Sequence, residues 1–211
     1  ETLLEGYAAT SIGPYTVNGY PVPLVNKVSG DAKLNWNPAT NQIDIAAGLP
    51  IGTYPIVLNA SNGVSPDTTF TFTLTIVKAP TLTGPAAVSL PEGYAAANTA
   101  LFTVGGAPAP TVTVSGAAEL SWNPVMKWID IAPGLPAGLH PVILKASNGI
   151  PPDATFTFTL MVVKAAGLGG PPPTEIMLTA GYAATSSSAY TLTGFPVPSV
   201  IKVSGDAKLN W

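Results

Sequence analysis

The 211-residue sequence has a formal net charge of −3, with eight lysines, no arginine and no cysteine. Without clustered cations a nucleic-acid-binding role is excluded, and without cysteine so are disulfide scaffolds, cysteine-ligated metals and thiol catalysis. The chain contains 23 Pro and 21 Gly, yet 46% of its residues are hydrophobic. This composition favours a turn-rich, all-β fold over a helical or a disordered chain.

The sequence repeats itself with a period of about 87 residues. The stretch Ile43–Lys78 is matched by Ile129–Lys164, and the motif LNWNP returns once as LSWNP before LNW ends the chain. Residues 6–36 and 181–211 are identical at 23 of 31 positions, so the third copy resembles the first more than the second. We therefore expect two complete domains and the first half of a third.

Alternating apolar positions mark the first three strands expected in the first copy. They are Thr2–Leu4, a strand marked by Tyr15 and Val17, and a strand that holds Val25 and Val28. The third strand should contain a β-bulge, because the second copy is one residue shorter at this point.

Two more strands are expected on either side of a hairpin loop at residues 37–41. Leu34 and Trp36 should face the core from the first of them, and Ile43 and Ile45 from the second. The loop is rich in asparagine and proline, which are turn residues.

The last two expected strands are Tyr54–Ser61 and Phe70–Val77. In the second of them phenylalanine, leucine and isoleucine alternate with threonine, which is typical of a half-buried antiparallel strand. The pair Asn62-Gly63 supplies the positive φ that a turn between the two strands needs.

Seven short strands per copy predict a sandwich of two sheets. A G-x-P-x-P segment occurs in each copy and belongs at a sheet edge or a crossing, where proline is tolerated. Gly/Pro-rich segments follow each last strand as semi-rigid spacers, so the domains should line up as a rod. The expected boundaries are residues 1–78 for repeat 1, 79–85 for a linker, 86–164 for repeat 2, 165–173 for a Gly/Pro-rich linker and 174–211 for the incomplete repeat 3.

Three motifs of the first copy carry a family resemblance. GYPVPLVNKVSG, NPATNQIDI and GLPIGTYPIVLNASNGVSPDTTFTFTLTIV, with their second-copy partners, resemble the immunoglobulin-like tandem repeats of bacterial cell-surface and extracellular proteins. The resemblance covers nearly the whole chain and implies all-β, seven-stranded immunoglobulin-like sandwiches that act as spacers, stalks or adhesive modules. The chain departs from it where Trp36, Trp122 and Trp211 replace smaller apolar residues, and where His140 replaces the tyrosine found at Tyr54.

Four aspartates recur at the repeat period, Asp44 with Asp130 and Asp67 with Asp153. A residue that every copy keeps serves the fold more often than a site, and no spacing pairs two carboxylates at the roughly 5–10 Å that glycoside hydrolysis needs. Neither linker holds an acid that could bind calcium. His140 lies on an inward strand face, where we expect it to fill space. The sequence thus predicts no catalytic residue, no metal site and no cofactor.

Trp128 is the residue with a candidate contact role. It replaces Gln42 on the outward side of its strand, whereas Trp36 and Trp122 alternate with inward leucines and should plug the two cores. A tryptophan exposed in one copy is a candidate contact for a glycan or a protein surface.

The outward positions hold threonine, serine, alanine and asparagine, and only 9% of the residues are charged. Such a surface loses little side-chain entropy on association, so it favours self-association; it equally fits a stalk selected for protease resistance or glycosylation. No apolar run is long enough for a membrane-spanning helix, so we expect no membrane insertion. No secretory signal opens the sequence, so we expect the mature part, or a fragment, of a longer product.

The leading hypothesis is a structural protein without enzymatic activity, in which tandem repeats form an extracellular, cell-surface stalk or filament. Its partners would be neighbouring repeats or other copies of the chain. The incomplete third copy is either cut from a longer tandem chain or completed by strands of another molecule. The alternative functions are an adhesion or glycan-binding module and an accessory segment of a larger cell-wall or polysaccharide enzyme.

Overall fold

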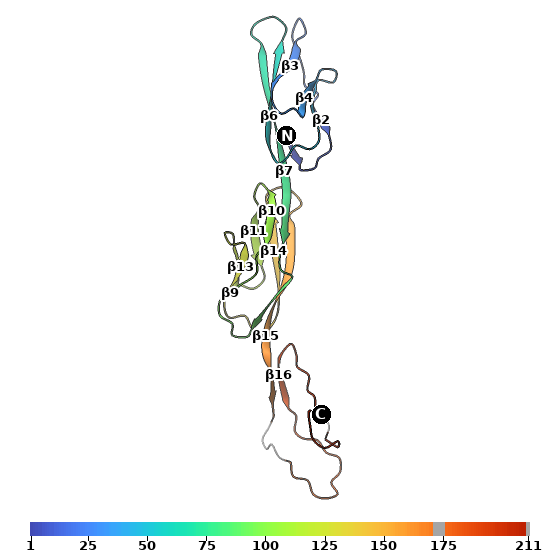
Figure 1. The fold of residues 1–211 in the computed structure, drawn as a ribbon, viewed down its shortest axis with the longest axis vertical. Helices are drawn as coiled ribbons and strands as arrows, with labels where there is room; N and C mark the ends of the chain where they lie inside the picture. The colour runs from blue at the N-terminus through green and yellow to red at the C-terminus, as the bar shows by residue number, and fades with distance from the viewer. Residues whose placement is uncertain (171–175, 210–211) are drawn as a thin grey trace. The chain divides into compact units, whose positions relative to one another are not determined.

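The computed structural model describes residues 1–170 and 176–209, in which the chain is all-β and forms no helix (Figure 1). The expected linker residues 171–173 and Trp211 lie outside the described residues. The first copy contains β1 (Thr2–Leu4), β2 (Thr10–Ile12), β3 (Leu24–Ser29), β4 (Leu34–Asn37), β5 (Gln42–Ile45), β6 (Gly52–Ser61) and β7 (Thr68–Thr83). The second copy contains β8 (Ala87–Pro91), β9 (Ala97–Asn98), β10 (Thr103–Ala107), β11 (Thr111–Ser115), β12 (Leu120–Asn123), β13 (Trp128–Ile131), β14 (Gly138–Ser147) and β15 (Ala154–Gly169). The third copy contributes β16 (Thr191–Phe195).

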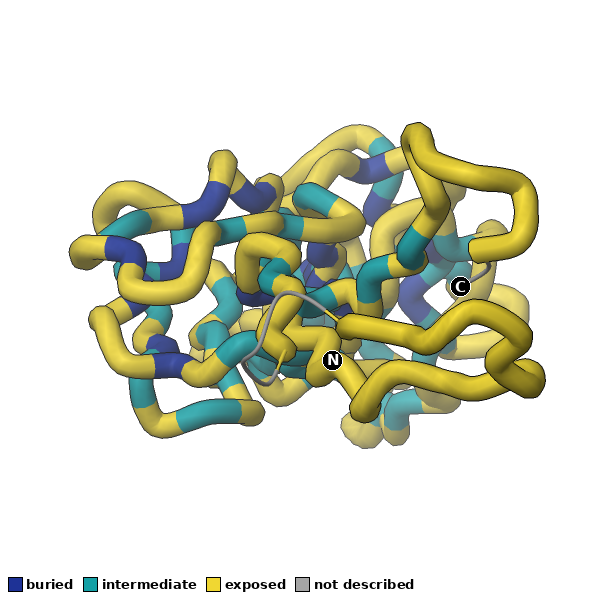
Figure 2. The backbone as a smooth tube through the Cα atoms, turned by 90° about the horizontal axis from the view of Figure 1, so that it is seen from below, coloured by how far each residue is buried: buried dark blue, intermediate teal, exposed yellow. Residues whose placement is uncertain are grey.

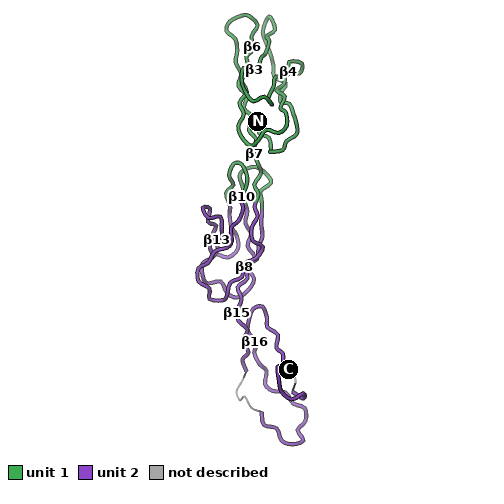
Figure 3. Tube along the Cα trace, in the orientation of Figure 1, with its two compact units in different colours: residues 1–81, 104–111, 146–154 green, residues 82–103, 112–145, 155–211 purple. Residues whose placement is uncertain are grey.

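The chain divides into two compact units, which Figure 3 colours separately. Unit 1 comprises residues 1–81, 104–111 and 146–154, and unit 2 comprises residues 82–103, 112–145 and 155–211. Unit 1 therefore takes in two segments of the second copy, so the units do not coincide with the repeats expected from the sequence. The repeat boundaries remain a prediction.

Two sheets face each other in the first copy. One has the order β1-β7-β6-β3, with β10 also paired to β7, and the other has the order β2-β5-β4. β1 runs parallel to β7, while β6 is antiparallel to both of its neighbours. The predicted β-bulge is confirmed, because the register of β3 against β6 shifts between Lys27 and Ser29.

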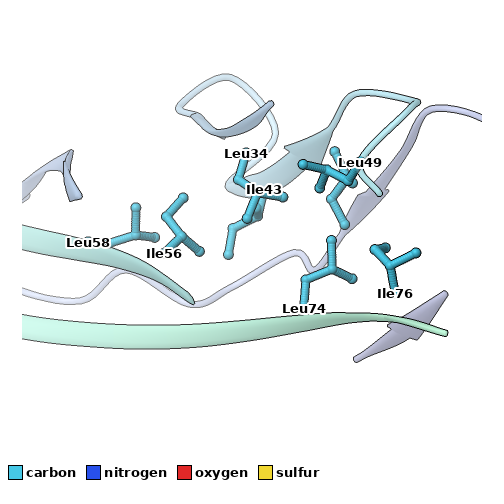
Figure 4. Packing of buried hydrophobic residues seen from close by; sticks show 8 residues of the cluster. Leu34, Ile43, Leu49, Ile56, Leu58, Leu74 and Ile76 are labelled. Carbon is cyan, nitrogen blue, oxygen red and sulfur yellow. The ribbon is translucent and has the colours of Figure 1, made fainter. Parts of the chain in front are cut away.

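The core of the first copy lies between these sheets. Leu34, Ile43, Ile56 and Leu74 come from β4, β5, β6 and β7 and are fully buried (Figure 4). Each such side chain stabilises the fold by about 1.5–3 kcal/mol relative to an exposed one. We expected Trp36 to plug the core, but it is only partly buried and packs against this cluster without belonging to its buried residues.

The second copy repeats the arrangement. Its sheets have the orders β11-β14-β15-β16, with β8 paired to β15, and β12-β13-β9. Leu120, Ile129, Val142 and Leu160 stand where the first copy has its four central residues, and they are also buried. The all-β sandwich architecture predicted from the alternation of apolar residues is therefore confirmed.

Two expectations about the edges of the sandwiches are wrong. No strand forms at Tyr15–Val17; the strand that precedes β3 is β2, and residues 13–20 have no strand structure. The segments 79–83 and 165–169, which we expected to be linker, are the ends of β7 and β15. Both errors have one cause: these segments form strands only where a segment from another copy pairs with them.

The third copy is exposed along nearly its whole described length, which appears in yellow near the C-terminus in Figure 2. No residue between 176 and 209 is buried, and the large apolar side chains Met177, Ile201 and Val203 are 94%, 78% and 91% exposed. The described part of this copy therefore has one strand and no core.

Candidate functional site

The last strand of each complete copy continues past its own sandwich. We call Lys78–Thr83 the β7 tail and Lys164–Gly169 the β15 tail. β7 pairs with β10, and the tail residues 78–81 and the β10 residues 104–107 belong to unit 1. Within unit 2 the β15 tail is antiparallel to β16, with Gly167 opposite Thr193 and Gly169 opposite Thr191. Each tail therefore adds a strand to the edge of the copy that follows it, a form of β-augmentation.

Small residues let the backbones of tail and edge approach. A Cβ at Gly105 would lie 2.5 Å from Oγ1 of Thr81, and a Cβ at Gly167 would lie 2.5 Å from Oγ1 of Thr193. Glycine stands on the receiving strand in the first pair and on the tail in the second. In both places it leaves room for a threonine opposite it.

Aromatic rings meet the end of each tail in the same way. A Cβ at Gly84 would lie 2.1 Å from the ring of Phe102, and a Cβ at Gly170 would lie 2.3 Å from the ring of Tyr190. The glycine that follows each tail is thus required by a ring that packs on it. The corresponding ring of the first copy belongs to Tyr15.

An asparagine amide ties the β7 tail to the second copy. Nδ2 of Asn148 donates to the backbone oxygens of Lys78, at 2.9 Å, and Pro108, at 2.8 Å. In the first copy, Nδ2 of the equivalent Asn62 donates to the oxygen of Pro21 at 2.8 Å. The two asparagines hold the same turn, and Asn148 uses its second amide hydrogen for the tail.

A cleft of about 680 Å³ opens at the corresponding place in the first copy, within unit 1. Its walls include Tyr15, Asn18, Tyr20, Trp36 and Phe70. Tyr20 is 95% exposed and Phe70 45% exposed, while the rings of Tyr15 and Phe70 pack with centroids 5.3 Å apart. Burial, and to a lesser extent the negative charge of Glu1, raise the pKa of Tyr15 above its ordinary value.

The sequence did not point to the cleft or to the tails. Lys78 occupies an inward position of the alternation in β7, and its Nζ lies 2.9 Å from Oε2 of Glu5. The apolar pattern at the inward positions then resumes with the buried Pro80 and Leu82. A lysine and a proline at inward positions read as the end of a strand. The signal that could have found the tail is the return of alternation after them.

We expected Trp128 to be exposed, but it is partly buried. Its indole Nε1 donates to Oδ1 of Asp130 at 2.8 Å, and Nδ2 of Asn123 donates to the other carboxylate oxygen at 3.2 Å. The polar edge of the ring is therefore engaged within its own hairpin, and only ring carbons are offered to a partner.

The repeated acids make local hydrogen bonds. Asp44 accepts from Ser11 Oγ at 2.7 Å and from Asn37 Nδ2 at 3.0 Å, as Asp130 does from its own neighbours. Hydrogen bonds from Ser61 and Asn59 lower the pKa of Asp67. The described residues contain no group of three or more His, Cys, Asp or Glu side chains that could hold a metal.

His140 makes the same side-chain hydrogen bond to a turn as the tyrosine that it replaces. Its Nε2 lies 2.9 Å from the backbone oxygen of Pro136, as the hydroxyl of Tyr54 lies 2.8 Å from that of Pro50. A carbonyl only accepts, so Nε2 carries the proton. This role in a turn accounts for the residue.

No known protein family matches the chain, and no curated protein matches it. Solved structures do. Extracellular domains 3–5 of Drosophila OTK superpose with a TM-score of 0.57 at 13% identity, covering 77% of this chain and 58% of that one. Immunoglobulin domains 1–4 of Sidekick-1 give 0.56 at 14% identity, covering 76% and 46%.

The chain thus spans about half the length of these structural neighbours. At such identities the likeness shows the fold alone: the chain is built from tandem immunoglobulin-like β-sandwiches. The described residues include no helix long and apolar enough to cross a membrane.

Proposed function

We propose that this chain is a structural segment of an extracellular, cell-surface protein, whose tandem immunoglobulin-like repeats form a stalk or filament without enzymatic activity. The observation that carries the proposal is the sharing of strands between successive copies, by the β7 tail with β10 and by the β15 tail with β16. A strand shared between two sandwiches restrains their orientation far more than a flexible linker would. Restrained orientation is what a stalk requires.

The surface supports the same proposal. Only 9% of the residues are charged, and the outward side of β7 is a row of threonines. Such surfaces associate at a low cost in side-chain entropy. The resemblance to repeats of bacterial surface proteins and the extracellular origin of the OTK domains agree with this location.

Small-angle X-ray scattering of the full chain tests the stalk. A single compact body of 211 residues has a radius of gyration of about 17 Å, whereas repeats held in line give a value above about 25 Å. A value above 25 Å that does not change with ionic strength is the expected result. A value near 17 Å contradicts the proposal.

A second candidate, a glycan- or protein-binding module, rests on Trp128, which stands where the first copy has Gln42. The exposed carbons of its ring offer a stacking surface next to β12. A glycan array probed with the chain tests this function. The variant Trp128→Gln, which restores the first-copy residue, should lose the binding; binding that survives the substitution removes Trp128 from the site.

A further inference from the structure

The hairpin that joins β12 to β13 carries large apolar side chains at its turn. Val125 and Met126 are 83% and 45% exposed. Leu101, which is 64% exposed, lies beside the turn, because the backbone N–H that follows it donates to the oxygen of Lys127 at 2.7 Å. We call residues 101 and 125–128 the hairpin tip; all of them belong to unit 2.

The first copy builds the same hairpin without this chemistry. The backbone bond is present there too, since the N–H of Tyr15 donates to the oxygen of Asn41 at 2.7 Å. The sequence WNP precedes the turn and IDI follows it in both copies. At the tip positions themselves the first copy has small or polar residues, which are Pro14, Ala39, Thr40, Asn41 and Gln42. Since the same hairpin forms with either set, the fold does not require the apolar one.

One of these differences works against the backbone. Asn41 and Lys127 both have a positive φ, of 53° and 58°. Asparagine tolerates this left-handed conformation, whereas a lysine adopts it at a cost in free energy. The side chain of Lys127 is exposed. The second copy therefore places a cation among the apolar side chains of the tip at a position where the backbone favours asparagine.

The backbone donors of the tip are satisfied inside the hairpin. Oδ1 of Asn123 accepts from the N–H of Val125 at 3.2 Å and from that of Met126 at 3.0 Å. The backbone oxygen of Asn123 accepts from the N–H of Lys127 at 2.8 Å, and the indole N–H of Trp128 is bonded within the same hairpin. A ligand read through hydrogen bonds finds these donors occupied. A lipid bilayer, by contrast, admits backbone groups that are satisfied within the protein.

We propose that the hairpin tip binds the surface of an anionic lipid bilayer, with Leu101, Val125 and Met126 entering the acyl region. Trp128 then lies at the level of the headgroups, where tryptophan is enriched, and Lys127 meets the anionic phosphates. The small size of the tip favours lipid over a protein partner, because each side of a standard protein interface contributes about 20–30 residues. The contact lies on one face of the bilayer and needs no membrane-spanning helix. It goes beyond the proposed stalk, since it does not depend on strands shared between repeats.

Co-sedimentation of the full chain with vesicles tests the contact. Vesicles of phosphatidylcholine and phosphatidylserine in equal parts should bind the chain with half-saturation at about 1 mM accessible lipid, given the exposed fractions of three apolar side chains and one cation. Vesicles of phosphatidylcholine alone should bind about fivefold more weakly, because the cation lacks a partner. A spin-labelled lipid in the vesicles should broaden the NMR amide signals of residues 125–127. No binding to the mixed vesicles at about ten times the expected lipid concentration would overturn the proposal.

Variants that restore first-copy residues locate the contact. Val125→Ala combined with Met126→Thr should weaken vesicle binding at least about tenfold, because each methylene withdrawn from the acyl region lowers the affinity. Lys127→Asn should weaken binding to the mixed vesicles about fivefold and leave binding to phosphatidylcholine unchanged. Leu139→Thr is the matched control: it also restores a first-copy residue and removes a leucine that is 61% exposed elsewhere on the same sandwich, so the affinity should not change.

The site is refuted by vesicle binding that survives the double substitution at residues 125 and 126, by an equal loss in Leu139→Thr, or by broadening that spares residues 125–127. A double variant that loses self-association in the absence of lipid, with lipid binding intact, would make the tip a protein contact and would also overturn the proposal. Because the substituted side chains are exposed, the urea midpoints of the variants should match that of the unmodified chain, which shows that they fold. None of these outcomes bears on the scattering test of the stalk, which concerns repeats within one chain.

Discussion

Leu82→Ala asks whether the β7 tail is a packed part of the second sandwich. Leu82 is 8% exposed and Leu168, at the same position of the β15 tail, is 58% exposed. Full burial of a leucine is worth about 1.5–3 kcal/mol, and truncation adds a cavity term, so Leu82→Ala should lower the free energy of unfolding by about 2–3 kcal/mol. The matched Leu168→Ala has less than half of the area to lose and should cost about 1 kcal/mol or less.

Urea denaturation measures these losses, followed through backbone amide NMR signals of the second copy so that this sandwich is read by itself. We expect a lower midpoint for Leu82→Ala with an unchanged slope. A loss below about 0.5 kcal/mol for Leu82→Ala, or equal losses in the two variants, would show that the tail is a linker lying loosely on the surface.

Three further predictions concern single side chains. Trp36→Ala should lower the free energy of unfolding by about 3–4 kcal/mol because the ring packs against the core cluster. Trp128→Ala should lower it by about 1–2 kcal/mol, mainly through the loss of a hydrogen bond and of partial burial. Urea denaturation compares the two variants, and equal losses would contradict the difference in packing. His140→Tyr should keep the free energy of unfolding within about 0.5 kcal/mol, while His140→Phe loses the bond to the turn; a Phe variant as stable as the Tyr variant would contradict that bond. Hydrogen bonds lower the pKa of Asp67 in the folded state, so its contribution to the stability of the fold is present above the ordinary pKa near 4 and is lost as pH falls through the folded value. In a plot of the thermal unfolding midpoint against pH, Asp67→Asn should therefore make the decline at acid pH less steep. An unchanged decline would refute the assignment.

Period-2 alternation predicted the sandwich core well, because it depends on neighbours in the same strand. Leu34, Ile43 and Leu74 were assigned inward and are fully buried. The β-bulge in β3 was equally local, visible as a one-residue difference between two copies. These features could be predicted because each strand carries its own signal.

The edge strands could not be predicted, because a partner from another copy decides them. Tyr15–Val17 and the second-copy segment Phe102–Val104 have similar sequences, yet strand structure forms where the β7 tail supplies a partner. The tail itself was hidden by Lys78 and Pro80 at inward positions. Parity placed Trp128 outward, but it could not show that the ring is partly buried and that its Nε1 donates to Asp130, two residues along the same strand.

Amide hydrogen exchange at the β7 tail is the most direct test of the claim that successive repeats share strands. Measured by NMR on the full chain, the paired amides among Thr81–Thr83 and Val104–Gly106 should exchange at least about 100-fold more slowly than in an unstructured peptide, since they belong to one sheet. Exchange at Thr81–Thr83 as fast as in the unstructured peptide would mean that the segment is a flexible linker, and the stalk built on shared strands would be contradicted.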